Sequence, residues 1–387
     1  MMADNIEHVI SYYVAFQKFH SPALGAFAVV SHWAPFLLLG GYTGGLADRF
    51  DVRRLIQISM VMFMGVSIAW GVLFMTDSLE EWKAMVLLVI HGLAGVIWGP
   101  ATQVFLHRIV EVERLPNSVR LLATGRYLAM LLGPAVGSSI LLPFCGPAFG
   151  IFINALIYLP LVLWLTHAPY GALSRSIQAT RAKVQRATRD FWATVRVVAA
   201  NPVLSSMTVM IGASAFFVGN AYQAQMPGFA TDLGHARAGF AYGMLLGADA
   251  AGGLAAGIIL EGGGLLPPNP RVAFLLAMCW CIALGGFAFS STYAFALPLL
   301  FAAGFLELAF NSMAQSLVQI HAPGDIRGRV IGVFAMSANG MRTFSGLSVG
   351  LLGAYIGIHR SLASSAIALF TVLAIILATR FLHRAPR

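Results

Sequence analysis

The sequence has 387 residues, of which 58% are hydrophobic and 10% are charged. An ordinary soluble domain is about half apolar and about a quarter charged, so the composition excludes that class and indicates a polytopic membrane protein. The formal net charge of +9 would suit nucleic acid only if the basic residues formed one patch. They are spread over many loops instead, so no nucleic-acid partner is expected.

Apolar runs of the length needed to cross a bilayer recur along the chain. After a shorter stretch at 4–19, they lie at 24–47, 55–75, 84–106, 118–142, 147–166, 203–227, 237–260, 272–291, 293–318, 330–357 and 361–383. The sequence therefore predicts an all-α membrane protein with twelve candidate helices. Most basic residues fall in alternate loops, so the positive-inside rule places those loops and the C-terminus in the cytoplasm.

The longest polar break divides the predicted spans into two sets. It covers residues 168–201, and apolar side chains recur within it at helical spacing. We expect this segment to form an amphipathic linker on the cytoplasmic interface. The sequence thus predicts a six-helix bundle at 1–167, the linker at 168–201, and a second six-helix bundle at 202–387.

The two predicted bundles repeat each other. At one common offset, Gly44 and Asp48 correspond to Gly257 and Glu261, and further matches follow in the same register. Such a repeat is typical of duplicated transporter halves. The same offset places the start of the first helix about ten residues before Met1, so the first helix is expected to be truncated.

Three short motifs carry a family resemblance. They are Gly44, Asp48, Arg49, Arg53 and Arg54 after the second span; Gly133, Pro134 and Gly137 in the fifth; and Asp325, Arg327 and Arg329 before the eleventh. These motifs resemble those of the major facilitator superfamily, and in particular its drug:proton antiporter branch with macrolide and enterobactin exporters. The resemblance implies two pseudo-symmetric six-helix bundles, an antiporter-type fifth helix, and a cytoplasmic gate in which Asp48 meets the N-terminal end of the eleventh helix.

Ionisable side chains within the spans mark candidate sites, because they are costly in a membrane. They are Asp4, Glu7, His8, His91, Arg126, Asp249, Glu307 and Arg342, with His32 nearer a helix end. The proton-coupling candidates among them are Glu307, Asp249, Glu7 and His91, and the candidate counter-charges are Arg126 and Arg342. The alternatives are an interhelical hydrogen bond for His91 and structural ion pairs for Asp249 and Glu307.

Polar and aromatic residues in the spans are candidates for the wall of a substrate cavity. They are Asn220, Gln223, Asn311, Asn339, Trp33, Tyr222 and Phe310. For the aromatic residues, ordinary helix packing is an equal alternative. No cofactor and no metal site is expected from the sequence.

Together these features favour a secondary active transporter that exports a small amphipathic molecule, such as a drug, siderophore or metabolite, in exchange for protons. We expect a monomer in the plasma (inner) membrane of a bacterium. An uptake symporter on the same fold and a transporter-derived protein without transport activity stay as alternatives. The sequence lacks an HExxH motif, and its GxSxG match at Gly346–Gly350 lies inside the predicted span at 330–357 rather than at a strand end, which argues against an intramembrane enzyme.

Overall fold

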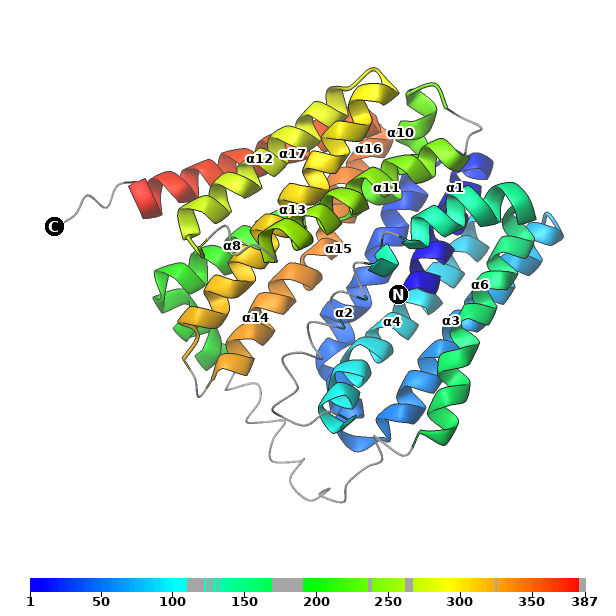
Figure 1. The fold of residues 1–387 in the computed structure, drawn as a ribbon, viewed down its shortest axis with the longest axis horizontal. Helices are drawn as coiled ribbons and strands as arrows, with labels where there is room; N and C mark the ends of the chain where they lie inside the picture. Colours follow the sequence, from blue (N-terminus) through cyan, green and yellow to red (C-terminus); the bar gives the residue numbers. More distant parts are fainter. Residues whose placement is uncertain are drawn as a thin grey trace. The chain divides into compact units, whose positions relative to one another are not determined.

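The computed structural model describes residues 1–109, 132–168, 191–235, 239–261, 267–323 and 326–382, with isolated positions between 122 and 130. Every regular element in these ranges is a helix (Figure 1). Nine helices of the described ranges are long and apolar enough to cross a membrane. The all-α prediction is confirmed, and the repeated apolar runs are the reason for the fold class, since a helix satisfies its backbone within lipid.

The chain divides into two compact units. The first contains the described residues up to 168 together with Ala224–Gly247, and the second contains 191–223 and the described residues from Ala248 onward. The domain boundaries drawn from the sequence stay a prediction. Most of the predicted linker, residues 169–190, lies outside the described residues.

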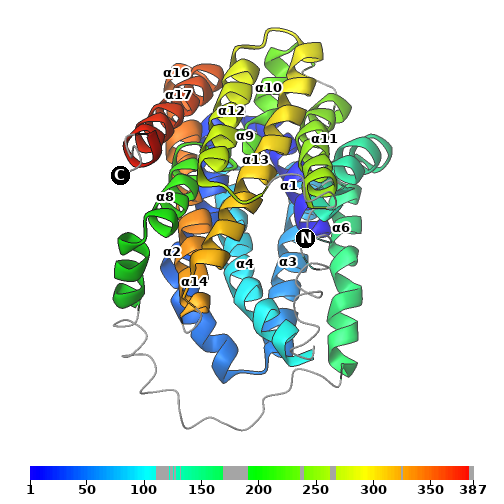
Figure 2. The same ribbon diagram turned by 60° about the vertical axis from the view of Figure 1, so that its left-hand side comes forward.

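The first unit is built on five long helices. They are α1 (Met2–Phe19), α2 (Pro22–Arg49), α3 (Val52–Met75), α4 (Glu81–Ile109) and α6 (Leu142–His167), and the π-helix η2 (Gly137–Leu141) and the short α10 (Met226–Asp232) complete it. Helix α3 packs against both α4 and α6, and the three run side by side in Figure 2. Trp70 and Ile151 are fully buried members of the core between these helices.

Capping residues set the starts of α2 and α3. Ser21 precedes Pro22, and its hydroxyl accepts a hydrogen bond from the Leu24 N–H at 3.2 Å, which is the expected cap before an N-terminal proline. Asp51 accepts the Arg53 N–H at 3.0 Å and starts α3. Because α2 continues to Arg49, the charged loop expected from Gly44 onward is helical for most of its length.

Glycines of the predicted fifth span lie against α1. A side chain added at Gly133 would approach Asn5 Cβ to 2.5 Å, and one at Gly137 would lie 3.5 Å from Ile6 Cα. The predicted fifth and sixth spans are joined without a long loop. The chain turns within α6 at Gly146, whose φ of 71° places it in the left-handed region that favours glycine.

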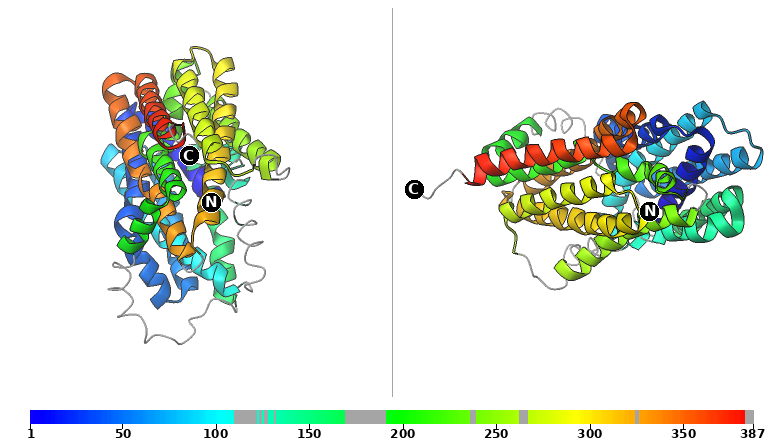
Figure 3. Two further views of the ribbon diagram at one scale, coloured as in Figure 1. Left: turned by 90° about the vertical axis from the view of Figure 1, so that its left-hand side faces the viewer. Right: turned by 90° about the horizontal axis from the view of Figure 1, so that it is seen from above.

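The second unit contains the remaining helices. They are α8 (Pro202–Phe217), most of α9 (Ala221–Ala224), the last part of α11 (Gly239–Ala256), η4 (Gly257–Glu261), α12 (Pro270–Phe289), α13 (Tyr293–His321), α14 (Arg327–Gly340), α15 (Arg342–Ser345), η5 (Gly346–Leu351), α16 (Leu352–Ile356), α17 (Ile358–Leu377) and η6 (Ala378–Leu382). Helix α12 packs against α13 and α17, and Figure 3 shows α17 in red beside them.

Two spans predicted as continuous are interrupted. The run at 203–227 breaks after α8, where Gly219 has a φ of 49°, and resumes as the short α9. The hydroxyl of Ser348 donates to the carbonyls of Phe216 and Phe217, at 3.0 and 2.8 Å. The helical hydrogen-bonding pattern is interrupted at the break, and a carbonyl within lipid needs a partner. The run at 330–357 is likewise divided among α14, α15, η5 and α16.

Close backbone approach joins α11 to α13. A side-chain carbon added at Gly252 would run into the carbonyl oxygen of Phe301, and one added at Gly304 would run into that of Asp249. Small residues allow such contacts between membrane helices. The contact at Gly304 brings the Asp249 backbone within one helical turn of Glu307.

We expect Gly304→Ala to destabilise the second unit, because the obstacle is a main-chain oxygen that cannot rotate away. Overpacking of this kind costs about 1–3 kcal/mol. Thermal unfolding of the purified protein in detergent measures the effect. The matched control is Gly285→Ala in α12, where the added carbon has no neighbour within 4 Å. Equal unfolding temperatures for the two variants would contradict this packing argument.

Arg53 ties the start of α3 to the end of α6. Its guanidinium bonds the Asp51 carboxylate, with Nη2 2.7 Å from Oδ2, and its Nη1 donates to the Ala168 carbonyl at 2.7 Å. Ala168 ends α6, and a cation is favoured at a helix C-terminus. Partial burial acts to raise the pKa of Asp51, but the hydrogen bonds from Arg53 outweigh it and lower that pKa overall.

The lowered pKa of Asp51 predicts a pH-dependent contribution to stability. A depressed carboxylate pKa stabilises the fold above the ordinary carboxylate range, and the benefit is lost as pH falls through the lowered value. At neutral pH the wild type should therefore have a higher unfolding temperature than Asp51→Asn. The difference should be at most about 3 °C, because the pair is partly exposed. The difference should shrink below about pH 4. A difference that grows on acidification would contradict the assignment.

Candidate functional site

His91 is the centre of a buried polar cluster in the first unit. Its Nδ1 lies 2.7 Å from Oε1 of Glu7, and its Nε2 lies 2.9 Å from Oδ1 of Asp4. Glu7 and His91 are each 2% exposed. Both carboxylates come from α1 and the imidazole from α4, so the cluster joins α1 to the spanning helix α4 through hydrogen bonds between an imidazole and two carboxylates.

Glu7 is held from its other side as well. The Ser67 hydroxyl on α3 donates to Oε2 of Glu7, and the Asn154 amide on α6 donates to the Ser67 oxygen at 3.2 Å. All three side chains are buried. The carboxylate of Glu7 is therefore oriented by direct partners from α3 and α4, and Asn154 on α6 supports the first of them.

Two further histidines lie beside His91. The ring centroid of His8 is 4.7 Å from that of His91, and the centroid of His32 is 5.6 Å from it. His8 and Asp4 are one turn apart on α1, with Nδ1 of His8 3.8 Å from Oδ1 of Asp4. A side-chain carbon added at Gly92 would run into the Ser31 carbonyl, so the residues next to His91 and His32 are in close backbone contact.

A second polar cluster lies in the second unit. The hydroxyl of Tyr222 on α9 is 3.1 Å from both carboxylate oxygens of Asp249 and 3.4 Å from Oε2 of Glu307. The Gln223 amide donates to Oδ2 of Asp249 at 2.8 Å. Asp249 is 6% exposed. Two acidic residues that are far apart in the sequence thus share one phenol hydroxyl.

A cavity of about 240 Å³, part of it open to solvent, borders this second cluster. Its wall contains Glu307, Asn311 and Arg342 together with the aromatic rings of Trp280 and Phe310. The Asn311 amide donates to the Glu307 carbonyl at 2.8 Å, and the two aromatic rings lie 5.3 Å apart. The wall is therefore apolar on one side and carries an amide and a cation on another.

The structure groups the predicted site residues into these two sets. Glu7 and His91 meet in the first unit; Asp249, Glu307, Tyr222 and Gln223 meet in the second, with Arg342, Asn311 and Phe310 at the adjoining cavity. Trp33 is buried against the His32 ring, and Asn339 on α14 is half-buried. Asn220 lies in the break after α8. Arg126 lies outside the described residues.

The residues of the predicted gate lie at helix ends. Gly44, Asp48 and Arg49 are in the last turns of α2, Arg53 and Arg54 begin α3, and Arg327 and Arg329 begin α14. Asp325 lies outside the described residues. The gate stays a prediction.

The sequence did not predict that the side chains around His91 meet in one cluster. It named Asp4, His8 and His32 as ionisable residues of the spans but gave them no common role, and it did not single out Ser67 or Asn154. The available signal was the one-turn spacing of Asp4 and His8 on one face of α1. The positions of α2, α3, α4 and α6 around that face required the structure.

Removing His91 should destabilise the first unit. His91→Leu leaves the buried Glu7 carboxylate without its imidazole, and breaking a buried pair in this way costs about 3–5 kcal/mol. The double variant Glu7→Leu/His91→Leu removes both charges, so we expect it to unfold at a higher temperature than His91→Leu alone. Thermal unfolding of the two single variants and the double variant gives the coupling. Strictly additive losses would show that the pair contributes no interaction energy.

The comparisons with known proteins identify the family. The sequence matches the family described as transmembrane secretion effector over residues 4–385. No curated protein sequence matches it. Among solved structures, it is similar to a bacterial homologue of the human lysosomal transporter Spinster in an inward-facing, unoccupied conformation. The identity is 14%, the TM-score is 0.71, and the match covers 98% of this chain and 94% of that one.

Two other solved transporters show the same likeness. The nucleoside transporter NupG matches with 15% identity, a TM-score of 0.67 and 97% coverage of each chain. A D-xylose-proton symporter matches with 14% identity, a TM-score of 0.68, and coverage of 96% of this chain and 95% of that one. At such identities the likeness shows the fold alone. The chain belongs to the transmembrane secretion effector family and is a multi-pass membrane protein with the major facilitator fold, a secondary transporter.

Proposed function

We propose that this transporter exports a small amphipathic molecule in exchange for protons, as a monomer, and that Asp249 and Glu307 carry the coupling proton. The observation that carries the proposal is the Tyr222 hydroxyl, which lies 3.1 Å from Asp249 and 3.4 Å from Glu307. A hydroxyl has one proton to donate, so it satisfies one carboxylate at a time. Ionising both carboxylates together would place two negative charges on a shared partner, which favours keeping one proton on the pair.

Arg342 supplies a means of release. It lines the same cavity as Glu307 and interacts with it electrostatically. When the cavity opens to water, the guanidinium compensates the charge that the departing proton leaves on Glu307. Entry of a proton from the other side of the membrane restores the singly protonated pair, and alternation between these states couples proton flow to substrate movement.

The cavity wall supports a substrate with apolar and polar parts. Trp280 and Phe310 offer aromatic surface, while Asn311 and Arg342 offer hydrogen-bond donors. The family description as a secretion effector supports export as the direction of transport. The segment 133–137 supports it as well, because it resembles an antiporter motif. The drug:proton antiporter branch, the bacterial plasma membrane and the cytoplasmic C-terminus belong to this proposal.

The test begins with cells that do or do not produce the protein, exposed to a chemically diverse panel of amphipathic compounds. We expect lower accumulation of at least one compound in producing cells. That compound is then used in proteoliposomes with an imposed pH gradient. Glu307→Gln and Asp249→Asn should each lower gradient-driven transport by at least about tenfold, because a variant without the proton-carrying carboxyl cannot use the pH gradient, which supplies about 1.4 kcal/mol per pH unit.

The two carboxyl variants are compared with a matched control and with a variant that removes only the hydroxyl shared by the two carboxylates. Glu81→Gln changes an exposed carboxyl at the start of α4 in the same way and should transport as wild type does. Tyr222→Phe keeps both carboxylates and should reduce the rate less than either carboxyl variant. If both Glu307→Gln and Asp249→Asn retain full gradient-driven transport, neither carboxyl carries the coupling proton. If the protein takes the compound up instead of exporting it, the proposed direction of transport is wrong.

A further inference from the structure

We propose that His8, His32 and His91, with Asp4 as the fourth ligand, form a binding site for a divalent transition-metal ion in the first unit. These residues come from α1, α2 and α4. The site contains none of the residues assigned to proton coupling in the second unit, so the inference does not rest on the proposed export. Three imidazoles and one carboxylate are a ligand set typical of zinc and similar ions.

The spacing of the ligand atoms fits one ion. One ring nitrogen from each histidine lies within 4.8 Å of the other two. Nitrogen ligands sit about 2.0–2.1 Å from zinc, so tetrahedral ligand atoms are separated by about 3.4 Å. Coordination of one ion requires the half-buried side chains of His8 and His32 to rotate and close the remaining distance.

Asp4 lies beside the nitrogens of two of these histidines. Its Oδ1 is 2.9 Å from Nε2 of His91 and 3.8 Å from Nδ1 of His8. An ion placed among these three atoms would replace their direct contacts with coordination bonds. It would also displace protons from the ligating nitrogens, because histidine binds a metal as the neutral imidazole.

The residues behind His91 fit the outer shell of a metal site. Glu7 bonds Nδ1 of His91 at 2.7 Å, so Nε2, which bonds Asp4 in the absence of an ion, is the nitrogen that would coordinate the metal once its proton is displaced. Ligating histidines commonly bond a carboxylate in this way. Ser67 and Asn154 hold Glu7 in turn, so the ligand is fixed through three buried side chains.

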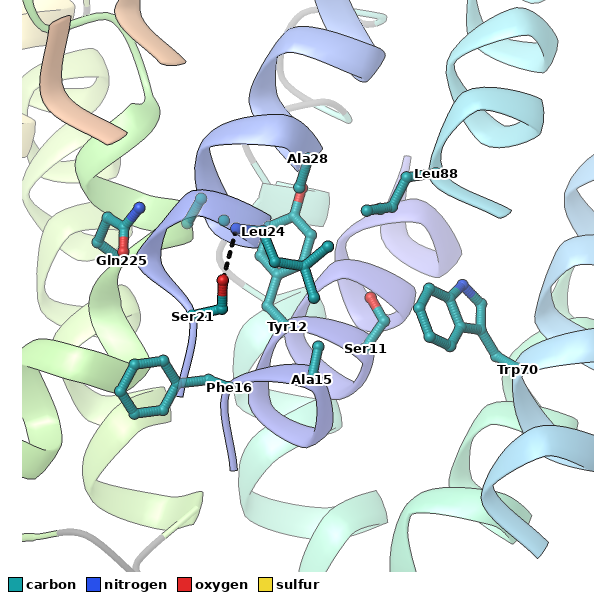
Figure 4. A pocket seen from close by; sticks show the side chains of 12 residues that line it. Ser11, Tyr12, Ala15, Phe16, Ser21, Leu24, Ala28, Trp70, Leu88 and Gln225 are labelled. Carbon is teal, nitrogen blue, oxygen red and sulfur yellow. Dashed lines mark hydrogen bonds between the residues drawn. The ribbon is translucent and has the colours of Figure 1, made fainter. Parts of the chain in front are cut away.

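The cluster is more exposed at His8 and Asp4 than at His91. The side chains of His8 and Asp4 are 19% and 21% exposed, whereas that of His91 is 3% exposed. A cavity of about 380 Å³, part of it open to solvent, lies one helical turn further along the same three helices. Tyr12, Ala28 and Leu88 line it (Figure 4), and the Tyr12 ring is 5.1 Å from that of His8.

The experiment measures binding of Co²⁺ to the purified full chain in detergent after treatment with a chelator. We expect one Co²⁺ per chain, with the strong visible absorption of a four-coordinate cobalt centre, and displacement of the cobalt by Zn²⁺. Mg²⁺ should not compete, because it prefers oxygen ligands. Binding is measured at equilibrium without a pH gradient, so its failure is distinguishable from failure of the proposed export.

Substitutions at the proposed ligands test whether the bound ion lies in this cluster. His8→Gln and His32→Gln should each weaken Co²⁺ binding by at least about tenfold, and Glu7→Gln, which removes only outer-shell support, should weaken it by about 10- to 100-fold. The control is His321→Gln, an exposed histidine at the end of α13. Size-exclusion chromatography and thermal unfolding check that each variant is folded.

Two results would overturn the proposal. One is the absence of stoichiometric Co²⁺ binding to the folded wild type, which would leave the cluster as an ion-paired network around His91. The other is equal Co²⁺ affinity in wild type, His8→Gln and His32→Gln, which would place the bound metal elsewhere on the chain.

Discussion

Lipid offers no hydrogen bonds, so every polar group that this chain places within its spanning helices depends on a partner from the protein. Glu7 shows the extent of the requirement, since both of its carboxylate oxygens have partners and these come from α3 and α4. The break after α8 meets the same requirement with a single serine, Ser348, which serves two carbonyls. In these two places the polar groups therefore belong to connected sets.

Close backbone contacts decide where those sets form. Gly92 lies against the Ser31 carbonyl, next to His91 and His32, and Gly304 lies against the Asp249 carbonyl, one turn before Glu307. In both units a glycine without a side chain brings two helices together beside the ionisable residues. Short side chains such as those of aspartate and histidine reach each other across helices only when the backbones approach this closely.

Much of the fold could be predicted from the sequence. Apolar length predicts the spans, and capping residues such as Ser21 and Asp51 mark where helices start. The break at Gly219 escaped prediction, because a glycine in an apolar run is equally compatible with a continuous helix. The site could be predicted only as a set of separate ionisable residues. Tyr222 was considered as an aromatic wall, and its hydrogen bonds to Asp249 and Glu307 depend on the placement of α9, which no local pattern specifies.

The shortness of α9 has a consequence for motion. A single isolated turn has no cooperative helical stability of its own, so Ala221–Ala224 is held mainly by the side chains around it. A small change in those surroundings is therefore sufficient to swing the phenol of Tyr222 without melting a long helix. The amide groups of this turn should exchange with solvent faster than those of the neighbouring α8, which makes the turn a natural place to observe the transporter changing state.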